Sequence, residues 1–116
     1  PAVKQSFDAG HLISTTTAMT FADGMACREP HPDALEIIRG GVGRIVSVSD
    51  EEVAQAIRVY FSETHNLAEG AGAAGLAALL RESGQLAGKR AAVVLSGGNI
   101  DRAMFREVLN GNTPSV

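Results

Sequence analysis

The sequence predicts an α/β fold, in which helices are layered on parallel strands, with a sheet that this chain does not complete. Strand and helix patterns alternate beyond residue 32, as in layered α/β domains. The apolar run Ala91–Leu95 is typical of a strand buried on both faces of a parallel sheet. Its only convincing companion is Ile45–Val48, whereas a stable sheet needs about three strands. We therefore expect a piece of a larger domain, unless residues 11–27 hide a third strand or a dimer completes the sheet.

The N-terminal part has the weakest pattern. Glycine, proline and a Ser-Thr cluster at residues 14–17 break residues 1–30 into short apolar pieces, which predicts loop and short strand. Pro32 and Asp33 then predict the start of a short helix, because proline fits the first turn and an acid complements the helix dipole there. Gly40–Gly41 should end that helix.

A stronger helix signal follows the short β-branched strand at Ile45–Val48. Ser49 and Glu52 have the Ser-x-x-Glu spacing of a capping box, in which each side chain accepts a hydrogen bond from the other residue's backbone N–H. The apolar stripe behind them predicts a helix that ends near His65. A second helix is predicted over residues 69–80, where small side chains allow another backbone or a ligand to approach closely.

The segment Ser96–Asn99 lies between the expected strand and a last helix, which should begin near Asp101 and end near Gly111. Ligands of open α/β sheets bind beyond the carboxyl ends of the strands, and glycines there let backbone N–H groups reach the ligand. The alternative is a glycine-rich turn in which Asn99 or Asp101 caps the last helix. The residue pattern alone favours neither interpretation.

Other kinds of site find little support. Residues 70–75 read Gly-x-Gly-x-x-Gly, but no buried strand precedes them and no acid follows about twenty residues later, so dinucleotide binding is not expected. None of the three histidines has a second ligand at metal-binding spacing, and we expect no metal site. The single cysteine, Cys27, can form no disulfide within the chain and has no catalytic partner signature. We predict no catalytic residue.

Charge and hydropathy narrow the expected partners and location. With 10 basic and 13 acidic residues the net charge is −3, and no basic patch combines with aromatic residues, so nucleic acid is not an expected partner. The longest weakly polar run, residues 67–80, is shorter than the roughly 20 residues that cross a bilayer, so a membrane is not one either. The N-terminus shows no secretory pattern, and we expect a cytoplasmic location.

Four stretches of the sequence occur in the order of a known family. They are Thr20–Gly24, Ile45–Glu52, Glu69–Ala73 and Val94–Asp101. In this order they resemble the C-terminal half of the fold-type II pyridoxal-phosphate enzymes, specifically the threonine/serine dehydratases and the related serine racemases. The resemblance implies that residues 1–116 are the C-terminal part of the large, three-layer, parallel-sheet domain that binds pyridoxal phosphate, without a regulatory domain.

For the site, the resemblance implies that Ser96 hydrogen-bonds the pyridine nitrogen of pyridoxal 5′-phosphate and that Gly97 supports the loop. It also implies that Gly24 and Glu69 lie beside the cofactor ring. The implied reaction is the β-elimination of water from L-threonine or L-serine, which gives a 2-oxo acid and ammonia. The implied partners are the amino-acid substrate, an N-terminal portion of the enzyme and further copies of the chain in a homo-oligomer.

The chain departs from the family because it has no lysine suited to form a Schiff base with the cofactor. The family carries that lysine in a Ser-Phe-Lys context, whereas Lys4 and Lys89 stand in other contexts. We therefore expect the chain alone to be inactive. The alternatives are a module that binds small anions without chemistry and a truncated product that self-associates to cover its exposed sheet.

Overall fold

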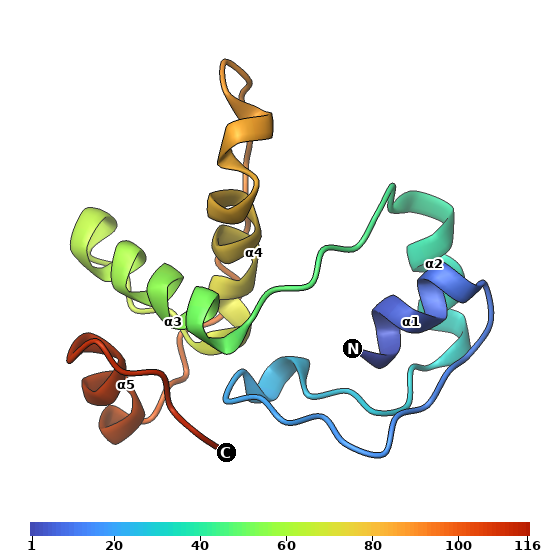
Figure 1. The fold of residues 1–116 in the computed structure, drawn as a ribbon, viewed down its shortest axis with the longest axis horizontal. Helices are drawn as coiled ribbons and strands as arrows, with labels where there is room; N and C mark the ends of the chain where they lie inside the picture. Colours follow the sequence, from blue (N-terminus) through green and yellow to red (C-terminus); the bar gives the residue numbers. More distant parts are fainter. The chain divides into compact units, whose positions relative to one another are not determined.

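The computed structural model describes residues 1–116, and its regular elements are all helical (Figure 1). In chain order they are α1 (Ala2–Ala9), the 3-10 turn η1 (Asp23–Met25), α2 (Pro32–Gly41), α3 (Asp50–Val59), the π-helical turn η2 (Tyr60–Thr64), α4 (Gly70–Arg81), the 3-10 turn η3 (Ser83–Leu86) and α5 (Arg102–Leu109). The chain divides into a first unit, residues 1–19 with 25–47, and a second unit, residues 20–24 with 48–116. No helix combines the length and the apolar composition that a bilayer crossing requires.

In the first unit, α1 occupies residues for which the sequence predicted loop or short strand, and that prediction was wrong. The helix has 8 residues and no side-chain cap at Pro1, so its local signals are weak. Contacts from elsewhere in the unit support it. The buried Ser6 Oγ accepts a hydrogen bond from Ile13 N at 2.8 Å, and Arg39 Nη1 donates to Gly10 O at 2.8 Å. No local sequence pattern reveals such contacts.

α2 confirms the helix predicted at Pro32. His31 Nδ1 accepts a hydrogen bond from Asp33 N at 3.3 Å and so caps the first turn. The helix ends at Gly41, so its end was also predicted correctly. α1 and α2 pack on each other and make up the helical part of the first unit.

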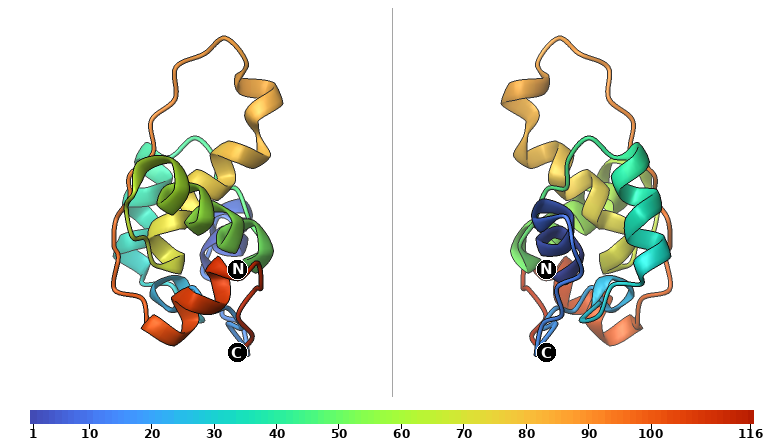
Figure 2. Two further views of the ribbon diagram at one scale, coloured as in Figure 1. Left: turned by 90° about the vertical axis from the view of Figure 1, so that its left-hand side faces the viewer. Right: turned by 90° about the vertical axis from the view of Figure 1, so that its right-hand side faces the viewer.

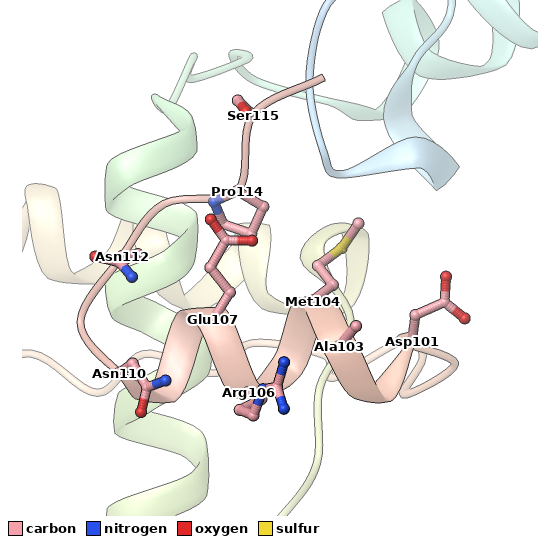
Figure 3. Close-up of a pocket in the computed structure, with 9 residues that line it drawn as sticks. All are labelled: Asp101, Ala103, Met104, Arg106, Glu107, Asn110, Asn112, Pro114 and Ser115. Carbon is pink, nitrogen blue, oxygen red and sulfur yellow. The ribbon is translucent and has the colours of Figure 1, made fainter.

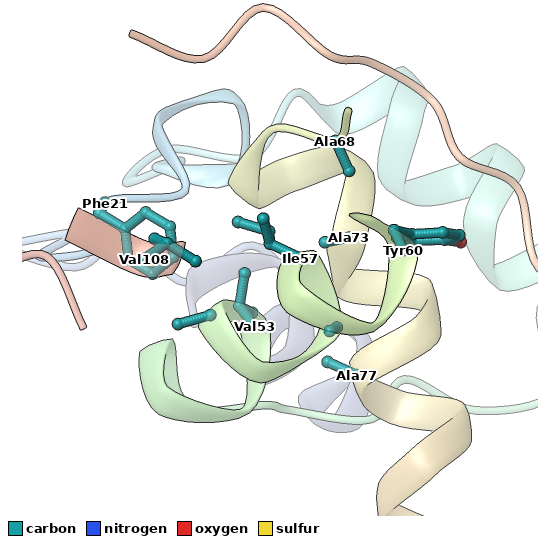
Figure 4. Close-up of a cluster of buried hydrophobic side chains, with 10 residues drawn as sticks. Phe21, Val53, Ile57, Tyr60, Ala68, Ala73, Ala77 and Val108 are labelled. Carbon is teal, nitrogen blue, oxygen red and sulfur yellow. The ribbon is translucent and has the colours of Figure 1, made fainter. Parts of the chain in front are cut away.

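The core of the second unit lies between α3 and α4 (Figure 4). Val53, Ile57 and Tyr60 point from α3 and the start of η2 into a cluster that Ala73 and Ala77 of α4 complete. Because alanine side chains are short, the two helix backbones approach each other closely. The other buried members of the cluster are Phe21, Ala54, Ala56, Ala68 and Val108.

α3 begins as the sequence predicts. Ser49 Oγ accepts a hydrogen bond from Glu52 N at 3.2 Å, and Glu52 Oε2 accepts one from Ser49 N at 2.7 Å, which completes the capping box. At its other end α3 passes into η2, a π-helical turn that no sequence pattern indicated. His65 then adopts a left-handed conformation, with φ of 56°, and ends the helix where an end was predicted.

The two expected strands, Ile45–Val48 and Ala91–Leu95, belong to no regular element of this structure. The second of them runs back along α4 (Figures 1 and 2), and a Cβ at Gly75 would lie 3.6 Å from Val93 Cβ. Side chains of this segment alternate, since Val93 is half-buried and Val94 is 79% exposed. One face of the segment is therefore covered by α4 and the other is open. The parallel sheet itself stays a prediction.

Candidate functional site

One wall of the candidate site is the loop Thr20–Gly24, which the first residue of α3 holds in place. Thr20 Oγ1 donates a hydrogen bond to Asp50 Oδ1 at 2.5 Å, and Phe21 N donates to Asp50 Oδ2 at 3.4 Å. Ala22 N in turn donates to Thr20 Oγ1 at 3.1 Å. Phe21 and Ala22 are both buried. The loop is therefore fixed to the start of α3.

Two glycines bring this loop against the first turn of α4. A Cβ at Gly70 would lie 2.7 Å from Ala22 Cα, so glycine is required for this approach of the two backbones. A Cβ at Gly24 would lie 3.0 Å from Ala71 Cβ. Gly24, which the resemblance places beside the cofactor, thus lies next to the start of α4.

The opposite wall is the loop Ser96–Asn99, which lies against the same turn of α4. A Cβ at Gly72 would lie 2.9 Å from Gly97 N, so no side chain separates the loop from the helix. Glu69 N donates a hydrogen bond to Gly97 O at 3.1 Å. The Glu69 carboxylate also faces the loop, because its Oε2 accepts a hydrogen bond from Asn99 N at 3.1 Å.

The structure thus brings together the site residues that the resemblance implied. Glu69 is the N-cap of α4, Gly97 packs on its first turn, and Ser96 adjoins Gly97. Gly24 approaches the same turn from the other loop. The first backbone N–H groups of a helix have no partner within the helix and lie at the positive end of its dipole. This end therefore favours a negatively charged group.

Ser96 is suited to meet an uncharged ring nitrogen. Its side chain is exposed, and its hydroxyl forms no hydrogen bond within the chain. A serine hydroxyl can donate or accept a hydrogen bond while it stays neutral. Gly97 and Gly98, which follow it, carry no side chain that would shield the hydroxyl. These residues fit the pyridine nitrogen of pyridoxal phosphate.

Helix capping does not explain the Ser96–Asn99 loop. Asp101 occupies the N-cap position of α5, but its side chain forms no capping hydrogen bond. Asn99 is bound through its backbone N–H to Glu69 rather than to α5. The sequence left two interpretations open, a ligand-binding loop and a turn that caps the last helix. The geometry disfavours the second.

Sequence reasoning missed Asp50 as a part of this site. Its position in the capping-box turn already gives this residue a local explanation. Nothing in the spacing indicates that its carboxylate accepts from Thr20, a residue 30 positions earlier. The only signal was that both residues belong to the stretches shared with the family.

A separate cavity of about 550 Å³ opens between α5 and the C-terminal tail (Figure 3). Its lining residues belong to α5 and to the tail. Asn112 N donates a hydrogen bond to Glu107 O at 3.2 Å and so ties the tail to the helix. This cavity is not lined by any of the candidate site residues Gly24, Glu69, Ser96 and Gly97. The candidate site is therefore the surface around the start of α4 and not this cavity.

Residues 1–97 match the family model described as "Pyridoxal-phosphate dependent enzyme". The chain is similar to the L-threonine ammonia-lyase of Thermotoga maritima, with 36% identity over 110 residues, which are 95% of this chain and 27% of that enzyme. It is also similar to the L-threonine ammonia-lyase of Geobacter sulfurreducens, with 43% identity over 102 residues, 87% of this chain and 25% of that enzyme. The chain thus spans about a quarter of the length of these relatives.

A solved structure, that of a bacterial threonine deaminase, superposes with a TM-score of 0.80 and 34% sequence identity. The match covers 86% of this chain and 36% of that one. The maize serine racemase superposes with a TM-score of 0.80 over 95% of this chain and 35% of that one, and at 23% identity it shows the fold alone. These superpositions are consistent with the α/β class expected from the sequence.

Proposed function

Because the chain belongs to the family of pyridoxal-phosphate dependent enzymes, we propose that it forms one wall of the cofactor site of an ammonia-lyase that acts on L-threonine or L-serine. The observation that carries this proposal is the convergence of the loops Thr20–Gly24 and Ser96–Asn99 on the first turn of α4. Both loops are stretches that the sequence shares with the family. The proposed reaction is the β-elimination of water, which gives a 2-oxo acid and ammonia.

Ser96 is the residue proposed to bind the pyridine nitrogen. When bound, pyridoxal phosphate supplies the electron sink that makes the α-proton of an amino acid acidic. An aspartate at the ring nitrogen would enforce a full positive charge there, whereas a neutral hydroxyl does not. With Ser96 at this nitrogen, the cofactor would be the weaker electron sink that suits elimination of a β-hydroxyl. Gly97 keeps Ser96 in place by its contact with α4.

The lysines of this chain do not complete such a site. Lys4 Nζ donates to Asp8 Oδ2 at 2.5 Å within α1. Lys89 lies beyond η3, at the other end of α4, whose 12 residues rise about 18 Å. We therefore propose that a lysine from polypeptide outside residues 1–116 holds the cofactor, and that this chain alone is inactive.

The open face of the extended segment at Ala91–Leu95 supports the proposal of a larger domain. Its backbone groups form no hydrogen bond within the chain, so they are available to pair with another strand. Val94 projects from the side away from α4 and is 79% exposed. We propose that further strands pair with this segment and that a second layer covers Val94, giving the C-terminal part of a three-layer domain.

The proposal is tested by a chimera in which this chain replaces the matching 110 residues of the Thermotoga maritima L-threonine ammonia-lyase. We expect the chimera to bind pyridoxal phosphate and to release a 2-oxo acid from L-threonine or L-serine. Ser96→Ala should weaken cofactor binding, since the hydroxyl at the ring nitrogen is lost. The matched control is Ser62→Ala, at an exposed serine of η2.

A folded chimera that binds no pyridoxal phosphate would contradict the proposal. Equal binding by the Ser96→Ala and Ser62→Ala chimeras would contradict the role given to Ser96. Binding of inorganic phosphate at Ser96, with no response to the pyridine ring, would favour the small-anion module instead.

A further inference from the structure

Glu69 occupies the N-cap position of α4 without capping that helix. Its backbone is extended there, with φ of −81° and ψ of 171°, but its side chain accepts no hydrogen bond from the first turn of α4. Serine, threonine, aspartate and asparagine are the usual residues at this position, because their short side chains reach the N–H groups of their own helix. A glutamate is one methylene longer than an aspartate and can reach further.

The Glu69 side chain reaches across to the loop Ser96–Asn99. Its Oε2 accepts a hydrogen bond from Asn99 N at 3.1 Å, while its own backbone N donates to Gly97 O at 3.1 Å. A carboxylate is a strong acceptor for a backbone N–H. One residue thus binds the loop at two points, on either side of Gly98.

The carboxylate also occupies the space beside Gly97. A Cβ built on Gly97 would lie 2.9 Å from Glu69 Cδ, closer than Cβ atoms come to their neighbours in proteins. On its other side, Gly97 meets the start of α4 through the approach of Gly72. The loop is therefore held between the helix backbone and the Glu69 side chain, and Ser96, next to it, keeps an unbound hydroxyl.

We infer that Glu69 is a positioning residue, which fixes the loop that presents Ser96, and that its carboxylate acts through Asn99 and Gly97 rather than by contact with the cofactor ring. The role in cofactor binding rests on the proposed function, whereas the contacts that carry it do not. The family resemblance implied instead that Glu69 lies beside the cofactor ring.

The contact with Asn99 is tested by amide hydrogen exchange of the 116-residue chain without ligand. We expect Glu69→Ala to speed exchange of the Asn99 amide by about tenfold or more, because the N–H loses a charged acceptor. Glu69→Gln keeps an acceptor oxygen of nearly the same reach and should retain most of the protection. Glu63→Gln, at an exposed glutamate of η2, is the matched control and should change nothing at Asn99.

Hydrogen exchange of the α3 amides distinguishes unfolding of the chain from a local effect on the loop. Val53, Ala54, Ala56 and Ile57 are the buried residues of α3, and the protection of their amides should stay the same in each variant if only the loop is released. Unchanged Asn99 exchange in Glu69→Ala, in a chain whose α3 amides are protected, would overturn the inference.

A second pair of variants tests the crowding at Gly97. Gly97→Ala introduces a methyl group against the Glu69 carboxyl, so it should speed Asn99 exchange. In a Glu69→Ala background the same methyl group enters an empty space. Gly97→Ala should then have a clearly smaller effect on Asn99 exchange, because the effects of substitutions at contacting residues are not additive. Additive effects of the two substitutions would contradict the proposed contact.

Addition of pyridoxal 5′-phosphate separates positioning from direct contact. A positioning role predicts that Glu69→Gln retains both Asn99 protection and the ligand-induced shift of the Ser96 amide. Retained protection with a lost Ser96 response would show that the carboxylate charge itself acts on the cofactor, and would overturn the inference. If the unsubstituted chain gives no Ser96 response, the proposed function fails, while the exchange results still decide whether Glu69 holds the loop.

Discussion

Gly72 and Gly75 lie one turn apart on α4 but face different surroundings. A Cβ at Gly72 would meet the backbone of Gly97 at 2.9 Å from N and 3.1 Å from C, so the loop would have to move. A Cβ at Gly75 would lie 3.6 Å from Val93 Cβ, which is ordinary contact. The two positions therefore differ in whether glycine is needed for packing, although both belong to the same small-residue run.

We expect the free energy of unfolding to change in opposite directions when each glycine is replaced by alanine. Gly72→Ala should lower the free energy of unfolding by about 1–3 kcal/mol, because the added methyl forces backbone movement. Gly75→Ala should raise it by about 0.5–1 kcal/mol, since alanine is the better helix former. Urea unfolding of the two variants checks this, and destabilisation of equal size would contradict the packing described here.

At the residue level, the sequence predicted the close approach on α4 but not its geometry. The glycines of residues 70–75 indicated that a backbone or ligand comes near, and the structure places both Ala22 and Gly97 there. The bond between Thr20 and Asp50 was not predictable, because it joins side chains 30 residues apart in contexts that each have a local explanation.

Among the elements, α3 has the most complete local specification. Its capping box satisfies two backbone donors of the first turn. We expect Ser49→Ala to lower the free energy of unfolding by about 0.5–2 kcal/mol, since Glu52 N loses its acceptor. Ser62→Ala, at an exposed serine, should change it by less than about 0.5 kcal/mol. Denaturant titrations of both variants give the comparison, and equal effects would argue against the cap.

The same turn should make stability depend on pH in the acid range. The hydrogen bond from Ser49 N lowers the pKa of Glu52 below its ordinary value of 4.5, and Arg81 adds to this, while burial works in the opposite direction. A carboxyl with a lowered folded-state pKa stabilises the fold above its unfolded-state value, and that contribution is lost as the pH falls through the folded-state pKa.

We therefore expect the stability difference between the unsubstituted chain and Glu52→Gln to shrink between about pH 6 and pH 3. Equilibrium unfolding at a series of pH values measures it. A difference that stays constant over this range would show that the Glu52 charge plays no part in the cap.

Elements with weak local signals were predicted less well. α1 has no capping side chain and is held by Ser6 and Gly10 through distant partners, so its sequence did not distinguish it from a loop. The π-helical turn η2 depends on how the end of α3 packs, which periodicity does not report. The start of α3 was predicted correctly in detail because the capping box is encoded within four residues.

For the whole molecule, the open face of the extended segment along α4 is the main feature to explain. The apolar run predicted burial on both faces, whereas half-buried and exposed side chains alternate along the segment in the structure. α4 covers one of the two faces. Strand pairing was not predictable from this chain, since it requires a neighbour that no segment of residues 1–116 provides in the structure.

We expect Val94→Lys to separate the stability of this chain from assembly with the rest of the domain. In the 116-residue chain Val94 is 79% exposed, so the free energy of unfolding should change by less than about 0.5 kcal/mol. In the chimera the lysine would be buried, and cofactor binding should be lost. Val116→Lys, at a valine that is 62% exposed, is the control and should leave both measurements unchanged. A functional Val94→Lys chimera would contradict a covered second face.

The most direct measurement of the central claim is a titration of the ¹⁵N-labelled 116-residue chain, in which the amides of residues 96–99 are followed. Pyridoxal 5′-phosphate and pyridoxal, which lacks the phosphate, should both shift the Ser96 and Gly97 amides, and Ser96→Ala should remove the response. Inorganic phosphate should not reproduce it. Shifts caused equally by phosphate alone, or the absence of any shift with pyridoxal 5′-phosphate, would contradict the assignment of this loop as a wall of the cofactor site.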